Sequence, residues 1–270
     1  MSSILDKIFA VKRLELEAKR RQVALESLMA RAMQAPAPRP FVDALRASRP
    51  AIIAEVKRAS PSKGDILPNL DPVAVAIDYL AAGAAAISVL TDSHFKGSLA
   101  DLEAVRAAVE LPLLRKDFIF DRYQVYEARA AGADCILLIA AMLGDGELRS
   151  LAALAHELRM AALVEVHDKI ELRRAEAAGA VLIGINNRDL HSFKTDIALT
   201  ETLLEGYRGD ALIVSESGIE SAADVRRLYA AGARAFLVGE SLLRGGEPRA
   251  KLSELAHALD AGADPARCQE

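Results

Sequence analysis

The chain has no tryptophan, few other aromatic residues (4%) and only two cysteines, Cys135 and Cys268, among its 270 residues. Aromatic side chains are the platforms on which many proteins stack single-stranded nucleic acid, so their scarcity argues against that function. The formal net charge of −4 provides no basic field that would attract DNA or an anionic membrane. Two cysteines are too few for the disulfide framework of a small secreted protein. We therefore expect neither nucleic acid nor a membrane as a partner.

Long hydrophobic runs are also missing. No apolar run approaches the roughly 18 to 20 residues that span a bilayer. Charged residues interrupt the start of the chain, where a secretory signal peptide would have an unbroken apolar region. We therefore expect a cytoplasmic protein. Hydrophobic residues still make up 52% of the chain, which allows a sizeable core, and the length suits one large α/β barrel or two smaller domains.

What the chain does contain is a regular alternation of apolar runs and helix-length segments. Eight runs of strand type lie at 52–57, 86–91, 112–118, 135–140, 161–166, 182–187, 211–217 and 235–240. Helix-length segments separate them at 71–82, 99–109, 122–131, 146–158, 169–178, 196–205 and 221–231. Such alternation predicts a parallel sheet of the α/β class, apolar because helices cover it.

An internal repeat indicates how many units there are. Ala-Gly-Ala occurs around Gly83, Gly132, Gly179 and Gly232, at spacings of 47 to 53 residues. Each glycine stands after a predicted helix, where it relieves the left-handed backbone that ends a helix. Each spacing holds two strand–helix units of about 25 residues. Eight such units fill roughly 200 residues, which predicts a (β/α)8 TIM barrel. A doubly wound open sheet is the alternative, but it would more often carry a glycine-rich turn after its first strand.

A helical extension precedes the predicted barrel. Apolar residues recur with a rough helical period through residues 1–34, three prolines follow, and 41–47 resemble a short second helix. We expect residues 1–48 to form this extension, 49–260 to form the barrel and 261–270 to be a loose tail.

Polar residues follow seven of the eight predicted strands, and in a barrel the carboxyl ends of the strands share one mouth. The first strand places Glu55 and Lys57 on the same face, because side chains two residues apart on a strand point the same way. Burying both charges is costly unless they pair or face a wet site. We therefore expect one shared polar site at the mouth.

The last two strands end in residues typical of a phosphate site. Ser217-Gly218 and Gly239-Glu240 precede predicted helix starts, where small residues and a helix N-terminus favour an anion. Ordinary glycine turns are the alternative. At such a site the backbone N–H of Glu240 would bind, and its carboxylate would point away.

Acid–base candidates lie on the odd-numbered strands. Lys57 and Lys116 are expected in the same layer of the barrel, where a lysine near another cation has a lowered pKa. Glu165 is a candidate base whose pKa burial would raise. Barrel-interior salt bridges without a catalytic role are the alternative. No His, Cys and Asp cluster has the spacing of metal ligands.

Five longer segments carry a family resemblance. They are IAEVKRASPS at 53–62, LRKDFI at 114–119, LVEVH at 163–167, IGINNRDL at 183–190 and VSESGI at 214–219. Together they closely resemble the indole-3-glycerol-phosphate synthases of tryptophan biosynthesis, and the similarity runs from the extension to the last strand. The resemblance implies a carboxy-lyase that converts 1-(2-carboxyphenylamino)-1-deoxyribulose 5-phosphate to indole-3-glycerol phosphate, CO2 and water, without a metal or organic cofactor.

The resemblance also implies residue roles. Lys116 would be the general acid of ring closure, and Glu165 would be the acid–base group in the loss of water. Lys57 with Glu55 would be a second proton-handling pair, and Asn186 would orient Glu165 and the substrate. The implied binding residues are Arg188 with Lys57 for the substrate carboxylate; Ser60, Ser217, Gly218, Gly239 and Glu240 for the phosphate; Phe95, Phe118, Leu137 and Leu190 for the aromatic ring; and Glu216 as a further polar pocket residue.

The resemblance further implies that the extension packs over the mouth and excludes water, and we expect a monomer. Ala59 departs from the family pattern, in which many members carry lysine, and Lys63 is a possible substitute. A sugar-phosphate isomerase barrel is one alternative, but it would need a Cys/Asp or paired-Asp couple on the first and fifth strands. A non-catalytic barrel is another, but it would predict that one catalytic charge is lost, and all four charged residues are present.

Overall fold

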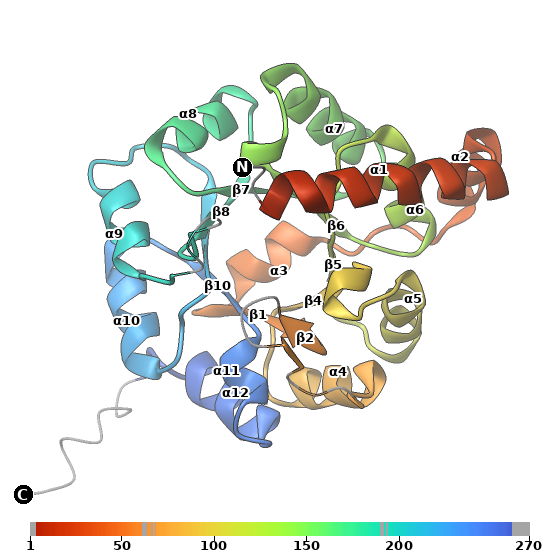
Figure 1. Ribbon diagram of the computed structural model, residues 1–270. Coiled ribbons are helices and arrows are strands. Elements are labelled where there is room, and N and C mark those ends of the chain that lie inside the picture. Colours follow the sequence, from red (N-terminus) through yellow and green to blue (C-terminus); the bar gives the residue numbers. More distant parts are fainter. Residues whose placement is uncertain are drawn as a thin grey trace, which may run out of the picture.

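A computed structural model describes residues 4–60, 64–65, 67, 69–189, 192 and 194–260, without the side chains of residues 4–7, 60 and 65. Its eight main strands are parallel and close into a barrel in the order β1-β10-β9-β8-β7-β6-β5-β4 (Figure 1). They are β1 (Ala51–Val56), β4 (Ala86–Leu90), β5 (Leu113–Lys116), β6 (Cys135–Ile139), β7 (Ala161–Val166), β8 (Leu182–Asn186), β9 (Leu212–Glu216) and β10 (Ala235–Val238). The predicted TIM barrel is confirmed. The open-sheet alternative is wrong, because β1 pairs with both β4 and β10.

Helices follow the strands and surround the barrel (Figure 1). They are α4 (Pro72–Ala81), α5 (Leu99–Ala108), α6 (Arg122–Ala130), α7 (Asp145–Glu157), α8 (Lys169–Ala177), α9 (Ala198–Leu204), α10 (Ala222–Ala231), α11 (Glu240–Leu243) and α12 (Pro248–Ala256). The four Ala-Gly-Ala glycines have φ between +77° and +121°, as predicted for residues that end a helix. No helix within the described ranges is long and apolar enough to cross a membrane.

The N-terminal extension contains three helices, α1 (Ile4–Gln22), α2 (Leu25–Gln34) and α3 (Phe41–Ala47). The helical character predicted through residue 34 is confirmed, with a break at Ala24, which is extended with φ −64° and ψ 146°. A contact from the barrel explains the break: the Tyr123 hydroxyl of α6 donates to the carbonyls of Lys19 and Val23 at the end of α1. A carbonyl bonded in this way no longer needs a further helical turn as its partner.

The barrel interior is apolar below the mouth. Along β1, Ile52, Ala54 and Val56 pack outward against the helices, whereas Ala51 and Ile53 pack inward. Phe41 and Leu45 of α3 join the same inner core and close the end where the strands begin. Glu55 is the next inward position after Ile53, so the alternation places a carboxylate where the apolar interior ends.

The loop after β1 contains more structure than the sequence indicated. Its first part, β2 (Ala59–Ser60), pairs antiparallel with β3 (Gly64–Asp65). Two 3-10 turns follow other strands, η1 (Ser93–Phe95) after β4 and η2 (Ala140–Met142) after β6. These short elements extend the rim of the mouth above the strand ends.

Candidate active site

A cavity of about 400 Å³ lies at the carboxyl ends of the strands. It brings together most of the site residues expected from the sequence: Glu55, Lys57, Phe95, Lys116, Phe118, Leu137, Glu165, Asn186, Arg188, Glu216, Ser217, Gly218, Gly239 and Glu240. Leu190, Lys63 and the side chain of Ser60 lie outside the described residues, so their predicted roles stay predictions. The converging residues lie between positions 55 and 240 of the sequence, and closure of the barrel brings them to one cavity.

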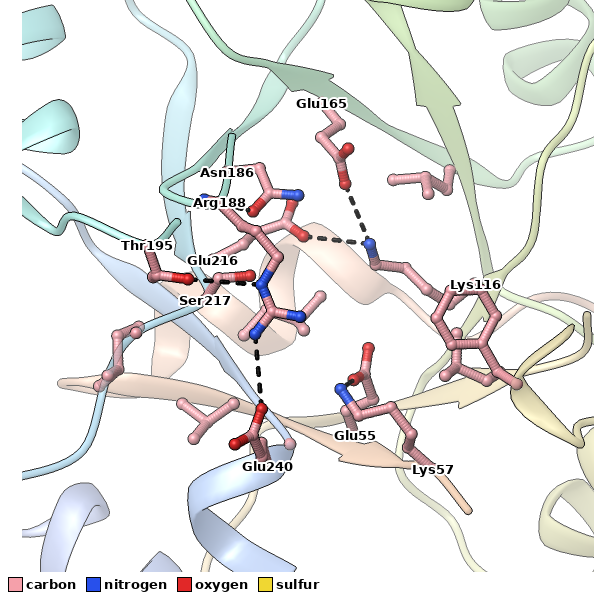
Figure 2. Close-up of a pocket in the computed structure, with 18 of the residues that line it drawn as sticks. Glu55, Lys57, Lys116, Glu165, Asn186, Arg188, Thr195, Glu216, Ser217 and Glu240 are labelled. Atoms are coloured by element: carbon pink, nitrogen blue, oxygen red, sulfur yellow. Dashed lines mark hydrogen bonds and ion pairs between the residues drawn. The ribbon is translucent and has the colours of Figure 1, made fainter. Parts of the chain in front are cut away.

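Five charged residues at the centre of this cavity form what we call the mouth cluster: Glu55, Lys57, Lys116, Glu165 and Glu216. Lys116 Nζ lies 3.0 Å from Glu165 Oε2 and 3.2 Å from Glu216 Oε2. Lys57 Nζ lies 2.6 Å from Glu55 Oε1, which confirms the expected pairing along β1. Figure 2 shows Lys116 of β5 joined to Glu165 of β7 and to Glu216 of β9. The cluster is buried, since the three glutamates are at most 5% exposed.

The charge balance around Lys116 differs from the expectation. Burial lowers the pKa of Lys116, but the charges of Glu165, Glu216 and Glu55 outweigh burial and raise the pKa above its usual range. The expected lowering of the lysine pKa is therefore wrong, because carboxylates rather than a second cation surround the ammonium group. Lys116 is protonated in the resting site.

The two glutamates that contact Lys116 titrate differently. Burial raises the pKa of Glu165, but Lys116 and His167 outweigh burial and bring the pKa well below its usual range. Burial also raises the pKa of Glu216, to about 7, with help from the charges of Glu165 and Glu55 and despite the attraction of Lys116. The raised pKa expected for Glu165 therefore belongs to Glu216.

Glu216 has room for its side chain only because its neighbour on β8 is glycine. A Cβ atom at Gly184 would lie 2.0 Å from Glu216 Oε1. That same oxygen is buried and has no hydrogen-bond partner among the described residues. An unpartnered buried carboxylate oxygen favours the protonated form, which agrees with the raised pKa of Glu216.

A second buried group of charges lies behind β5, and we call it the outer cluster: Lys12, Asp92, Arg115, Asp117 and Glu127. Arg115 Nη2 lies 2.9 Å from Asp117 and 2.7 Å from Glu127, and Lys12 Nζ lies 2.8 Å from Asp117 and 2.9 Å from Asp92. The sequence placed the polar run Arg115-Lys116-Asp117 at the mouth as a unit. Side chains alternate along a strand, so Lys116 faces the mouth cluster while Arg115 points to α6. Lys12, which ties α1 to the strand ends, was missed.

The residues predicted to hold the phosphate lie on the opposite side of the cavity. Ser217 and Gly218 have φ of +66° and +79°, so the chain turns sharply after β9. Arg188 Nη2 lies 3.4 Å from Glu240 Oε2, and Arg188 Nε donates to Thr195 Oγ1 at 3.4 Å (Figure 2). Glu240 also accepts from Arg244 at 2.5 Å. Its carboxylate is thus held by two guanidinium groups.

Asn186 makes a hydrogen bond that the sequence did not indicate, and its predicted role stays a prediction. Its Oδ1 accepts a hydrogen bond of 3.1 Å from the backbone N–H of Arg188. Glu165 is contacted instead by Lys116 and His167. In this structure Asn186 therefore shapes the turn that carries Arg188.

An apolar wall completes the cavity. The rings of Phe95 and Phe118 stack with their centroids 6.4 Å apart and an interplanar angle of 28°. Leu137 lies beside them as a buried residue of the inner core. Ile8 of α1 also lines the cavity, and the sequence offered no signal for it because a helix residue gives no sign of which distant surface it covers.

Comparison with known proteins agrees with this geometry. The family model described as indole-3-glycerol phosphate synthase matches residues 5–255. A protein of that name from Roseiflexus sp. (strain RS-1) is 52% identical over 265 residues, covering 94% of this chain and 98% of its own. One from Acidithiobacillus ferrooxidans (strain ATCC 53993 / BNL-5-31) is 50% identical over 260 residues, covering 94% and 99%.

Among solved structures, 3-hexulose-6-phosphate synthase from Salmonella typhimurium matches with a TM-score of 0.63 at 16% identity, covering 77% of this chain and 98% of that one. The N-acetylmannosamine-6-phosphate 2-epimerase from Clostridium perfringens matches with a TM-score of 0.59, also at 16% identity, covering 75% and 92%. At such identities these likenesses show the barrel fold alone.

Proposed function

The chain belongs to the indole-3-glycerol phosphate synthase family, and from this premise we propose how the mouth of its barrel performs that reaction. The substrate is 1-(2-carboxyphenylamino)-1-deoxyribulose 5-phosphate, and the products are indole-3-glycerol phosphate, CO2 and water. The observation that carries the assignment of roles is Lys116, a buried ammonium held 3.0 Å from Glu165 and 3.2 Å from Glu216 in the centre of the cavity.

Lys116 is the general acid of ring closure. As the ring carbon attacks the substrate carbonyl, a proton must reach the carbonyl oxygen, and a protonated lysine on the inner face of β5 is in position to donate it. The surrounding carboxylates keep Lys116 charged until the substrate displaces them. Such proton transfer contributes a rate factor of about 10² to 10⁴. Loss of CO2 then returns an electron pair to the ring.

Dehydration uses the remaining members of the mouth cluster. Lys57, paired with Glu55 at 2.6 Å, protonates the departing hydroxyl group. Glu165 accepts the proton that the ring gives up, because the pKa of Glu165 is low enough to keep it ionised beforehand. Asn186 supports Arg188 by its hydrogen bond to the Arg188 N–H. After Lys116 has donated its proton to the substrate, the ionised Glu165 can accept the proton from the ring.

Binding is divided between the two ends of the cavity. The turns at Ser217-Gly218 and Gly239-Glu240, together with Ser60, hold the phosphate largely through backbone N–H groups. Arg188, with Lys57, holds the substrate carboxylate. Phe95, Phe118, Leu137 and Leu190 pack against the aromatic ring, and Glu216 completes the polar side. Contacts to the phosphate provide binding energy remote from the reacting atoms and orient them.

The extension of residues 1–48 serves as a cover for the mouth. Support comes from Ile8, which lines the cavity, and from Lys12, whose ammonium group pairs with Asp92 and Asp117 beyond the ends of β4 and β5. Closure of this kind excludes water and strengthens the charge interactions inside. We propose that the active species is a monomer.

A direct assay tests the function. Purified protein, without added metal, should produce the fluorescence of indole-3-glycerol phosphate from the substrate named above. Light scattering on the same sample gives the molar mass of the active species. Absence of turnover with a correctly folded protein would overturn the proposed function.

A further inference from the structure

His167 lies between two carboxylates at the end of β7. Its Nδ1 is 3.1 Å from Glu171 Oε2, and its Nε2 is 3.4 Å from Glu165 Oε1. The same Glu171 oxygen accepts a 2.8 Å hydrogen bond from the His167 backbone N–H, so one carboxylate holds both the backbone and the ring. The proposed roles above leave His167 unused.

The orientation of this imidazole is fixed from α8. Asp168 caps the helix by accepting 2.8 Å hydrogen bonds from the N–H groups of Ile170 and Glu171, which holds the first turn in place. With Nδ1 engaged by Glu171, Nε2 points toward Glu165. That nitrogen is buried and makes no hydrogen bond with any described residue, so it is directed at Glu165 without another partner. Glu165 thus has His167 at Oε1 and Lys116 at Oε2.

The proton balance of the proposed reaction requires such a group. Ring closure places one proton on the carbonyl oxygen, and dehydration places a second on the departing hydroxyl. Only one proton returns to the protein from the ring, since the carboxylate leaves as neutral CO2. Each turnover therefore consumes one proton that the substrate does not supply.

We propose that His167, oriented by Glu171, holds this proton in reserve inside the covered site. The Nε2–H bond of His167 breaks and its proton forms an O–H bond at Glu165 Oε1, and Glu165 passes the proton to the neutral amine of Lys116. His167 is left neutral and takes a proton from water between turnovers. The proton that Glu165 accepts from the ring returns through the mouth cluster to Lys57, which gave its own proton to the departing hydroxyl. The inference rests on the proposed function, and His167 is a positioning residue and proton source that acts through Glu165.

The charges around the ring suit this role. Burial lowers the pKa of His167, but the neighbouring carboxylates of Glu165 and Glu171 raise it to about 10, so the ring carries its proton at neutral pH. On α8, Asp168 caps the helix, and Arg174 is engaged by Asp145 and by the carbonyls of Ala140 and Leu143. Glu165 and Glu171 therefore set the charge of the imidazole.

Transfer becomes favourable only during turnover. In the resting site Lys116 and His167 both keep Glu165 ionised. Once Lys116 has given its proton to the substrate, Glu165 loses one of its two cationic neighbours and its affinity for a proton rises. The proton of His167 can then move to Glu165. The step in which Lys116 loses its proton is therefore also the step that allows His167 to replace it.

Replacement of His167 by glutamine tests the proposal. Glutamine retains a hydrogen-bond donor but cannot carry the proton, so H167Q should lower kcat by about 100-fold while KM changes by no more than about threefold. Imidazole added to the buffer should restore kcat of H167Q in a saturable way and leave the wild type unaffected. H167N should behave in the same way, and thermal melting identifies which of the two variants is folded.

His94 provides a matched control. Its Nδ1 lies 2.9 Å from Asp92 Oδ1, so it is also a carboxylate-paired histidine beyond a strand end, but it belongs to η1 rather than to the mouth cluster. H94Q should retain kcat within about twofold and should not respond to imidazole. A rescue of H94Q equal to that of H167Q would overturn the proposal.

Glu171 gives an independent readout. E171Q leaves the imidazole in place but removes a charge that raises its pKa, so the fall of kcat at alkaline pH should shift by about one unit toward neutrality. The proposal would be overturned if kcat of E171Q fell at the same alkaline pH as kcat of the wild type. It would also be overturned if H167Q were slow and imidazole did not restore its kcat, and His167 would then be a structural residue. Absence of turnover by the wild type would instead overturn the proposed function.

Discussion

Two buried charge clusters flank β5, and three consecutive residues divide between them. Arg115 and Asp117 belong to the outer cluster, and Lys116 belongs to the mouth cluster. In the outer cluster the ion pairs of Arg115 and Lys12 measure 2.9 Å or less. Around Lys116 the distances are 3.0 and 3.2 Å, and three carboxylates face the ammonium group.

The difference separates charges that hold the structure from charges that move protons. Burial raises the pKa of Asp117, but Arg115 and Lys12 outweigh burial and leave the pKa far below its usual range. Asp117 therefore stays ionised near neutral pH. At the mouth the pKa of Glu216 is raised to about 7. A group whose pKa lies near the working pH can give or take a proton in catalysis. A buried ion pair whose members stay charged near neutral pH can instead hold a helix or strand in place.

The substitution with the largest expected effect removes the central lysine of the mouth cluster. Lys116→Met removes the proton donor, so kcat for ring closure should fall by about 10³- to 10⁴-fold while the substrate still binds. The fluorescence assay measures the rate, and equilibrium dialysis with the substrate measures binding. The lost cation leaves the buried Glu165 with His167 as its cationic neighbour, so the free energy of unfolding should fall as well. Wild-type turnover by K116M would remove Lys116 from its role.

The matched substitution on the other face of β5 should have the opposite result. Arg115→Met leaves Asp117 and Glu127 without their shared buried cation, which should lower the free energy of unfolding by about 3 to 5 kcal/mol. Urea denaturation measures the loss. The fraction that remains folded should keep a kcat near that of the wild type. If folded R115M lost kcat as K116M does, the two clusters would not differ in the way described.

Glu216→Gln sharpens the comparison through pH. The pKa of Glu216 is about 7 in the folded protein against 4.5 as the ordinary value, so the folded state binds more protons between those values. Stability therefore falls as pH rises through this window, by roughly 3 kcal/mol at most from this group. E216Q should remove that fall.

Denaturation of the wild type and E216Q at several pH values between 4.5 and 7 gives the difference. The lowered pKa values of Asp117 and Glu165 act below this window, where stability rises with pH, so they do not obscure the result. If the free energies of unfolding of the two proteins changed with pH in the same way, Glu216 would not titrate near neutrality.

The smallest expected effect concerns the phosphate end of the cavity, where Ser217 follows Glu216 in the chain and Gly239 lies against Glu55. Ser217→Glu places a negative charge beside the proposed phosphate site, so KM should rise about tenfold or more through repulsion, with a smaller change in kcat. Ser217→Ala, which adds no charge, should change KM by less. Steady-state kinetics measure both constants. An unchanged KM in S217E would place the phosphate elsewhere.

Much of the architecture was predictable from local patterns. The eight apolar runs and the four Ala-Gly-Ala repeats indicated the barrel, because strand and helix periods and helix-ending glycines are properties of short segments. The alternation along β1 predicted that Glu55 and Lys57 share a face, and their 2.6 Å contact agrees. The break between α1 and α2 was not predictable, because its partner is Tyr123, a residue about 100 positions away.

The sequence by itself determined which charged residues stand at the strand ends and which family the chain resembles. Only the tertiary structure decided what those charges do. It turned Arg115 away from the mouth, brought Lys12 from α1 to Asp117, placed His167 against Glu165 and gave the raised pKa to Glu216. The physical reason is that a pKa depends on burial and on the inverse distance between charges, and those charges come from different strands.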